Sequence, residues 1–167
     1  MTTNEYILFD FDDPDKSGKW YVVNDDVMGG VSQSSFKMDK GIAVFRGTLS
    51  PDNNGGFASV RTRLSIETNV AYQGIKIRVK GDGKTYNMRF RNDNNFDGYA
   101  YQLKFKTEVD TWIEVEMPFK AFEAIFRGNK LFDKPGLEFD QVRQTGFLIA
   151  DKQFGEFKLE IDWIKCY

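Results

Sequence analysis

Apolar and polar residues alternate along several short runs of this chain, and no other sequence feature constrains its fold so strongly. Successive side chains of a β-strand point to opposite faces, so each run predicts a strand with one buried face. We expect strands over residues 7–11, 57–64, 75–80, 86–91, 99–106, 112–117 and 157–163. The unbroken apolar run 147–150 predicts a strand buried on both faces. Only residues 121–126 show a helical spacing of apolar side chains.

Turn-forming residues separate these runs, and no strand–helix–strand pattern, linker or low-complexity segment interrupts them. A length of 167 residues suits one domain. We therefore predict an all-β fold, a β-sandwich of two antiparallel sheets, with residues 1–167 as a single domain. Because the ends of a domain often lie close together, we also expect the strands at 7–11 and 157–163 to be adjacent.

The composition excludes several classes of function. The chain has no histidine, which removes histidine-based triads, proton shuttles and histidine metal ligands. Its one cysteine, Cys166, allows no internal disulfide. A net charge of −2 gives no reason to expect nucleic acid. The first residues do not resemble a signal peptide and no apolar run approaches the roughly 20 residues that span a bilayer, so we expect no membrane insertion and a cytoplasmic location.

We expect no metal and no cofactor. Four aspartates between residues 10 and 15 crowd around a proline turn, but no complete set of calcium ligands can be identified among them. Residues 93–98 copy the start of a calcium-binding loop, yet the position that requires a bidentate glutamate is Lys104. Both segments are therefore interpreted as turns.

The loop 24–32 is the first candidate binding segment. Its two glycines can adopt positive φ and allow close backbone approach, and its methionine is a flexible apolar residue in a polar loop. The candidate contact residues are Asn24, Asp25, Asp26, Met28, Gly29 and Gly30. An ordered structural loop remains the alternative. Adjacent side chains of a strand point to opposite faces, so the two aspartates do not form a catalytic pair unless the backbone loops there.

The polar sides of four alternating runs form the second candidate site. If these runs are neighbours in one sheet, as sequential strands usually are, their cationic side chains converge on a basic face. The candidate residues are Arg61, Arg78, Arg89 and Arg91, with Trp112 at the border. Guanidinium groups suit carboxylates, phosphates and sugar hydroxyls. The alternative is a solvated outer face with cross-strand ion pairs.

Several segments resemble one known family, that of the complex I intermediate-associated proteins, named for a thirty-kilodalton mitochondrial member. The similar segments are 24–32, 54–62, 79–86, 118–122, 126–128 and 149–161, in order along nearly the whole chain. The resemblance implies a galactose-binding-like jelly roll, akin to carbohydrate-binding modules, and a role in assembly rather than catalysis. The mitochondrial member assists assembly of respiratory complex I. Without a transit peptide, this chain resembles a bacterial member.

The residues and the resemblance together favour a non-catalytic binding domain over an enzyme. We expect a protein partner, in the manner of an assembly factor or chaperone. Carbohydrate binding is the first alternative, favoured by the implied fold and by aromatic and planar polar side chains on strands. RNA binding through the basic face is the second alternative, and it predicts a steep dependence on salt.

Overall fold

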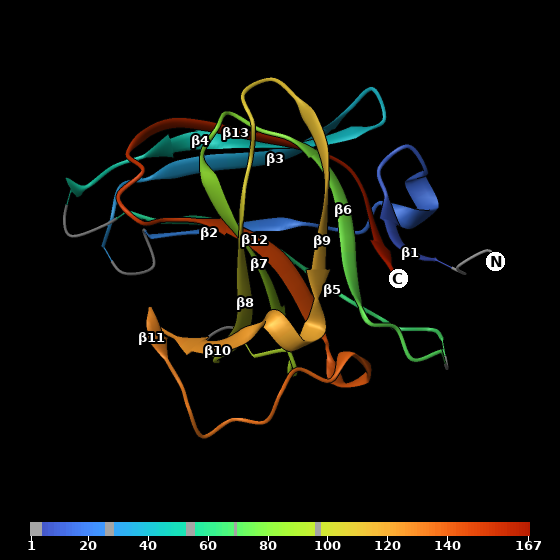
Figure 1. The fold of residues 1–167 in the computed structure, drawn as a ribbon. Helices are drawn as coiled ribbons and strands as arrows, with labels where there is room; N and C mark the ends of the chain where they lie inside the picture. Colours follow the sequence, from blue (N-terminus) through green and yellow to red (C-terminus); the bar gives the residue numbers. More distant parts are fainter. Residues whose placement is uncertain (1–4, 26–28, 53–55, 69, 96–97) are drawn as a thin grey trace.

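The computed structural model describes residues 5–25, 29–52, 56–68, 70–95 and 98–167. Its strands form two antiparallel sheets that pack face to face (Figure 1). The helical segments that lie wholly within these residues are short 3-10 turns, at Pro14–Lys16 (η1), Phe119–Ala121 (η4) and Phe139–Gln141 (η5). The predicted all-β sandwich is confirmed.

One sheet has six strands in the order β3–β4–β13–β6–β9, with β1 paired to β13. Their bounds are Tyr6–Asp10 (β1), Gln33–Asp39 (β3), Ile42–Leu49 (β4), Gly74–Lys80 (β6), Trp112–Pro118 (β9) and Gly155–Cys166 (β13). The long β13 pairs first with β4 and then with β1. The expected adjacency of the terminal strands is confirmed, and β1 lies beside the end of β13 in Figure 1.

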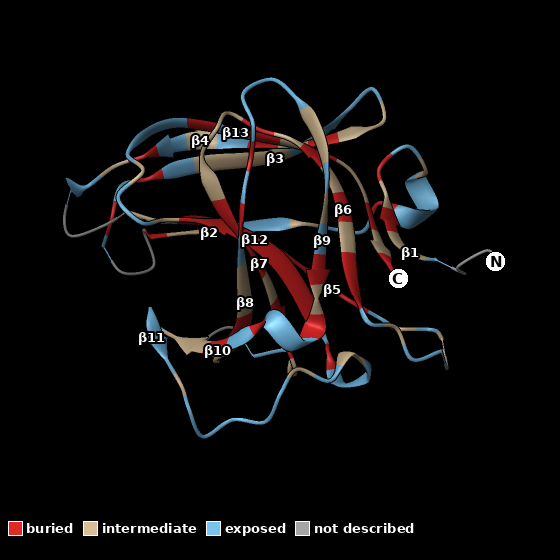
Figure 2. Ribbon diagram, viewed as in Figure 1, coloured by how far each residue is buried: buried red, intermediate tan, exposed pale blue. Residues whose placement is uncertain are grey.

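The other sheet has seven strands in the order β11–β10–β8–β7–β12–β5–β2. Their bounds are Tyr21–Asn24 (β2), Ala58–Arg63 (β5), Thr85–Arg91 (β7), Ala100–Lys106 (β8), Glu123–Phe126 (β10), Asn129–Lys130 (β11) and Gln144–Ile149 (β12). Every residue of the interior strand β12 is buried (Figure 2). This confirms the prediction made from the apolar run at 147–150.

The core lies between the two sheets and is rich in aromatic rings. Phe45, Phe90 and Tyr86 are fully buried there, and Phe45 meets Phe157 edge-on with ring centroids 5.0 Å apart. Because side chains alternate along β7, burying Tyr86, Met88 and Phe90 sends the residues between them to the opposite side of the sheet. The alternation of the sequence thus fixes which side chains remain outside the core.

Three local expectations were wrong or incomplete. Residues 121–126 do not form a helix: η4 ends at Ala121, and β10 pairs with β8 instead. Strands β6 and β7 follow one another along the chain but belong to opposite sheets. The hairpin of β3 and β4 was not predicted, although Lys40 and Gly41 have the positive φ values, 53° and 82°, of a tight two-residue turn.

Candidate functional site

A row of aligned residues crosses the outer face of the seven-stranded sheet. In antiparallel sheets, directly paired residues point to the same side, so the strand pairing defines the row. Its members in strand order are Tyr21, Arg61, Gly146, Arg89, Gln102 and Glu123. The residues next to the two arginines, including Val60, Met88 and Phe90, lie in the core. The row therefore faces away from the core.

Three arginines gather around this row. Arg91 follows Arg89 by two residues on β7 and points to the same side. We call Arg61, Arg89 and Arg91 the arginine cluster. Arg61 is 9% exposed and Arg91 is 6% exposed, so these charged side chains are sheltered although they lie outside the core. Arginine side chains are rarely buried to this extent, and this distinguishes the cluster from an ordinary solvated surface.

Arg89 is the member whose surroundings are best defined. Its Nε donates a hydrogen bond to Gln102 Oε1 at 2.8 Å, which fixes the plane of the guanidinium group. Burial, followed by the positive charges of Arg91 and Arg61, lowers the pKa of Arg89 to about 10. No carboxylate of the described residues forms an ion pair with Arg89.

A narrow cavity opens between the arginines. It has a volume of about 10 Å³ and is lined by Ser59, Arg61, Arg89, Arg91 and Gly146, among others. This is roughly the space that one water-sized group occupies. Gly146 keeps this centre free of a side chain, and a Cβ at that position would lie 2.1 Å from the carbonyl oxygen of Val60. The three arginines thus border a slot with room for one small group, and Val60 and Phe147 complete its walls.

Neighbouring polar side chains extend the site along the sheet. Gln144 Nε2 donates to the carbonyl oxygens of Asp93 and Asn95, at 2.8 and 3.1 Å, and so holds the loop after β7 against this side. Asn87 is 2% exposed and donates to the Leu148 carbonyl oxygen at 3.3 Å. Its Oδ1 has no hydrogen-bond partner within the part of the chain that the structure describes.

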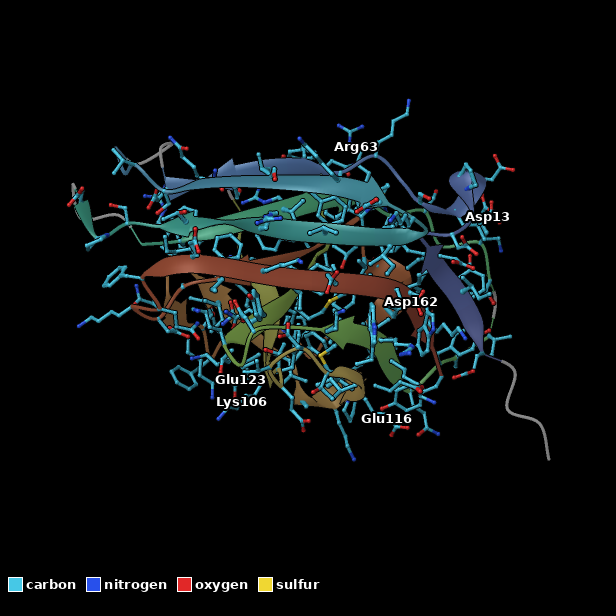
Figure 3. All side chains as sticks on the ribbon, turned by 90° about the horizontal axis from the view of Figure 1, so that it is seen from above. Asp13, Arg63, Lys106, Glu116, Glu123 and Asp162 are labelled. Carbon is cyan, nitrogen blue, oxygen red and sulfur yellow. The ribbon has the colours of Figure 1, made fainter. Side chains whose placement is uncertain are left out.

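The expectation that Arg78 joins the other three arginines is wrong. Arg78 lies on β6 of the six-stranded sheet, where it contacts Asp162 at 3.3 Å and stacks on the ring of Trp112 at 4.8 Å. Figure 3 shows Asp162 well apart from Glu123, which lies at the arginine row. The chain passes from one sheet to the other between successive strands, so sequence proximity did not imply a shared sheet. Arg78 and Trp112 belong to an outer face on which opposite charges are paired.

The loop 24–32 serves the architecture in its described part. The carboxylate of Asp25 is 1% exposed and accepts hydrogen bonds from the backbone N–H groups of Ser32 (2.9 Å) and Gly56 (2.6 Å) and from the Ser32 hydroxyl (2.6 Å). Burial alone would raise the pKa of this carboxyl, but the hydrogen bonds from Ser32 and Gly56 outweigh it and hold the pKa below its usual value. Asn24 Oδ1 accepts from the Ser34 hydroxyl at 2.7 Å.

Gly29 and Gly30 of this loop are each required for a different structural reason. Gly29 has φ of 88°, which L side chains rarely adopt. A Cβ on Gly30 would lie 2.3 Å from the carboxyl carbon of Asp25, so only glycine leaves room for that buried group. Asp26 and Met28, the other two candidates of the loop, lie outside the described residues.

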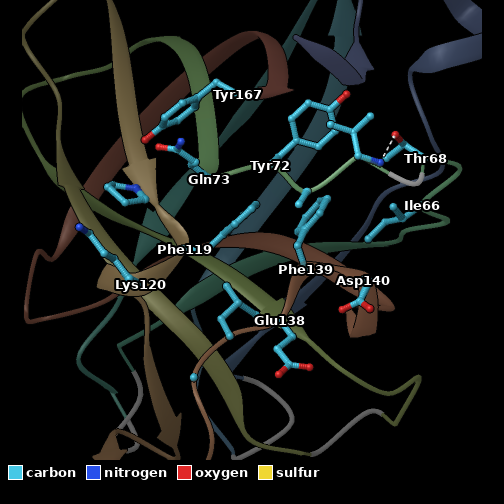
Figure 4. A pocket seen from close by; sticks show the side chains of 15 residues that line it. Ile66, Thr68, Tyr72, Gln73, Phe119, Lys120, Glu138, Phe139, Asp140 and Tyr167 are labelled. Atoms are coloured by element: carbon cyan, nitrogen blue, oxygen red, sulfur yellow. Dashed lines mark hydrogen bonds between the residues drawn. The ribbon is translucent and has the colours of Figure 1, made fainter. Parts of the chain in front are cut away.

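A larger cavity lies at one edge of the sandwich, away from every residue predicted from the sequence. Its volume is about 1010 Å³, and Tyr72, Phe119, Phe139, Lys120 and Tyr167 are among the residues that line it (Figure 4). Phe119 and Phe139 stack with ring centroids 4.7 Å apart. Aromatic walls with a few polar groups are typical of ligand sites, but this cavity holds no sheltered charge comparable with Arg89.

Comparison with known proteins decides the family. The family model described as complex I intermediate-associated protein 30 matches residues 9–161. This chain belongs to that family. The mitochondrial complex I intermediate-associated protein 30 of Mus musculus is 29% identical over 183 residues, covering 96% of this chain and 56% of its own length. The Drosophila melanogaster protein of the same name is 27% identical, covering 95% of this chain and 61% of its own length.

The chain therefore spans less than two thirds of the length of those curated relatives. Among solved structures it is similar to a family 11 carbohydrate-binding module from Clostridium thermocellum in complex with a β-1,3-1,4-mixed-linked tetrasaccharide. The TM-score is 0.68 at 19% identity, with 99% of this chain and 96% of the module covered. A family 29 carbohydrate-binding module has a TM-score of 0.57 at 7% identity, with 98% and 84% covered. These likenesses confirm the galactose-binding-like jelly roll.

Several residues of the site were missed or undervalued by sequence reasoning. Tyr21, Gln144 and Gly146 join the arginines only because β2, β5, β12 and β7 become neighbours in the sheet. Gly146 did carry a signal, since a glycine that precedes an apolar run in a central strand indicates close approach of another backbone.

No helix in the described part of this family member is long and apolar enough to cross a membrane.

Proposed function

We propose that this chain is a non-catalytic binding domain that captures a protein partner through the outer face of its seven-stranded sheet. One observation carries the proposal: Arg89 is sheltered among other arginines, on the side away from the core, with no ion-paired carboxylate from the described residues. A sheltered charge without such a partner lowers the stability of the free domain. The sheltered charge of Arg89 is accounted for if a binding partner supplies a negative group that pairs with it.

The family supports a protein rather than another ligand. Its curated members are named for association with intermediates of complex I, and assembly factors act by binding protein subunits. Whether the partner of this chain belongs to complex I is part of what the experiment determines. A cytoplasmic location also belongs to the proposal, and subcellular fractionation tests it against the mitochondrial location of the relatives.

The experiment is affinity capture from the native organism with the wild-type domain and two matched variants. Arg89→Gln removes one charge from the arginine cluster, whereas Arg46→Gln removes one from an exposed position on β4 of the other sheet. The partner is identified by mass spectrometry, purified and bound again in isolation. We expect Arg89→Gln to weaken this binding at least tenfold and Arg46→Gln to leave it within twofold. Equal binding by both variants would refute the proposed site.

Carbohydrate binding is the second candidate. Solved carbohydrate-binding modules share this fold, and the row that includes the arginines ends in Tyr21, a half-exposed aromatic ring whose hydroxyl donates to Gln144 Oε1 at 3.3 Å. Aromatic rings beside planar polar groups are suited to sugars. Affinity electrophoresis in gels that contain mixed-linked β-glucan tests this candidate, with Tyr21→Ala as the variant expected to lose retardation.

A further inference from the structure

We infer that the arginine cluster is a carboxylate-binding site that receives one acidic side chain of a partner protein. This inference rests on the proposed function, because it names the chemical group that the same face would hold. It is carried by the arrangement of Arg89, the cavity beside it and the contrast between Arg89 and the ion-paired cations of both sheets.

Arg89 differs from other cations of the two sheets, which form ion pairs. On the six-stranded sheet, Lys76 lies 3.2 Å from Glu5, Arg78 lies 3.3 Å from Asp162, and Lys80 lies 3.3 Å from Glu160. On the seven-stranded sheet, Lys104 lies 2.9 Å from Asp151 and Lys130 lies 2.8 Å from Glu123. Arg89 of that sheet instead has the neutral amide of Gln102 as its hydrogen-bond partner, and no carboxylate of the described residues forms an ion pair with it. A negative group from outside is therefore favoured at Arg89.

Gln102 prepares Arg89 for such a group. By accepting from Nε at 2.8 Å, it fixes the guanidinium plane and leaves the terminal nitrogens of the fork for other acceptors. Guanidinium groups bind carboxylates with short, charge-assisted hydrogen bonds that are about twice as strong as neutral ones. Burial strengthens these bonds further, because the local dielectric constant is lower than in water.

The size of the slot selects the source of the carboxylate. A cavity of about 10 Å³ accepts one oxygen atom of an acidic group but not a sugar ring. In a uronic acid the carboxylate is bonded directly to the ring, which would meet the walls formed by Arg61 and Arg91. Aspartate and glutamate carry the carboxylate on one or two methylene groups. A protein side chain can therefore reach the slot while its backbone stays above the sheet.

Titration of the purified full chain with acetate tests the anion site. The Nε–Hε resonance of Arg89 is assigned by its loss in Arg89→Gln and is followed by NMR against acetate and against neutral acetamide. We expect a saturable shift with acetate, none with acetamide, and an unchanged acetate response in Arg46→Gln. An equal response to acetamide, or an acetate response that does not saturate, would overturn the inference.

Two further probes distinguish the sources of the carboxylate. One is a blocked pentapeptide with a single glutamate among glycines, with its glutamine counterpart as control; the other is an oligomer of glucuronic acid. The glutamate peptide is expected to bind at least tenfold more tightly than either the glutamine peptide or the glucuronate oligomer. Tighter binding of the oligomer would overturn the assignment to a protein side chain.

The outcomes separate this inference from the proposed function. If Arg89→Gln loses the purified partner but neither acetate nor the glutamate peptide shifts Arg89, the face binds the partner by other chemistry and only the inference fails. If acetate binds but the partner is retained by Arg89→Gln, the anion site stands and the proposed site of partner capture fails.

Discussion

Arg89→Gln should stabilise the free domain while it weakens partner capture. The pKa of Arg89 falls from 12.5 to about 10 because of burial, Arg91 and Arg61. A pKa difference of one corresponds to about 1.36 kcal/mol, so keeping Arg89 charged in the folded state costs up to about 3 kcal/mol. The hydrogen bond to Gln102 offsets about 1–2 kcal/mol of this. The variant should therefore gain roughly 1–2 kcal/mol in its free energy of unfolding.

The sign of the pH dependence follows from the direction of the shift. A base whose pKa is lower in the folded protein than in the unfolded one reduces the free energy of unfolding at any pH at which it is protonated in both. This loss of stability is relieved only as pH rises through the folded pKa of about 10. The full cost is present at pH 7. For a domain of this size, 1–2 kcal/mol corresponds to an increase in Tm of about 2–8 °C.

Urea unfolding and scanning calorimetry at pH 7 measure the effect, with Arg46→Gln as the matched control. Arg46 is exposed on the other sheet, so its replacement should change the free energy of unfolding by less than about 0.5 kcal/mol. A domain that is less stable with Arg89→Gln than without it would refute the reasoning, since the guanidinium would then be satisfied by its own chain. An unchanged Tm in both variants would refute it equally.

The remaining predictions concern the loop 24–32 and the six-stranded sheet. Asp25→Asn should lower the free energy of unfolding by about 2–3 kcal/mol at pH 7, measured by urea unfolding, because the amide would face N–H donors. With its pKa held low, Asp25 stabilises the wild type above pH about 4, and this gain disappears as pH falls through the folded pKa, so the two proteins should converge in acid. Gly30→Ala should cost about 2–3 kcal/mol by the same assay through its clash with Asp25, whereas Gly136→Ala, which meets no atom within 4 Å, should cost less than about 0.5 kcal/mol. Arg78→Gln should retain the purified partner within twofold and change stability by less than about 1 kcal/mol, because Arg78 forms a partly exposed ion pair on the opposite sheet.

The alternating runs fixed most strands and the side of each strand that enters the core. Where a run was long and regular, as over β7 and β13, the pattern predicted both the strand and its buried face. It failed over residues 121–126, where the apolar spacing resembled a helix but pairing with β8 determined the conformation. Local propensity is weak compared with a complete set of backbone hydrogen bonds to a neighbouring strand.

The candidate site was likewise predicted only in part from the sequence. The sequence placed Arg89 and Arg91 on one face, because two residues of spacing on a strand return to the same side. It wrongly added Arg78, because strand order in a jelly roll does not follow chain order, and β6 and β7 lie in different sheets.

The sequence by itself determined the fold class, the resemblance to a family and the polar face of each strand, since all three depend on local alternation or on segments read in order. Only the tertiary structure decided which polar faces share a sheet. By inserting β12 between β5 and β7, it placed Gly146 between Arg61 and Arg89 and left a slot where a side chain would otherwise stand. That choice depends on long-range pairing, which no local pattern encodes.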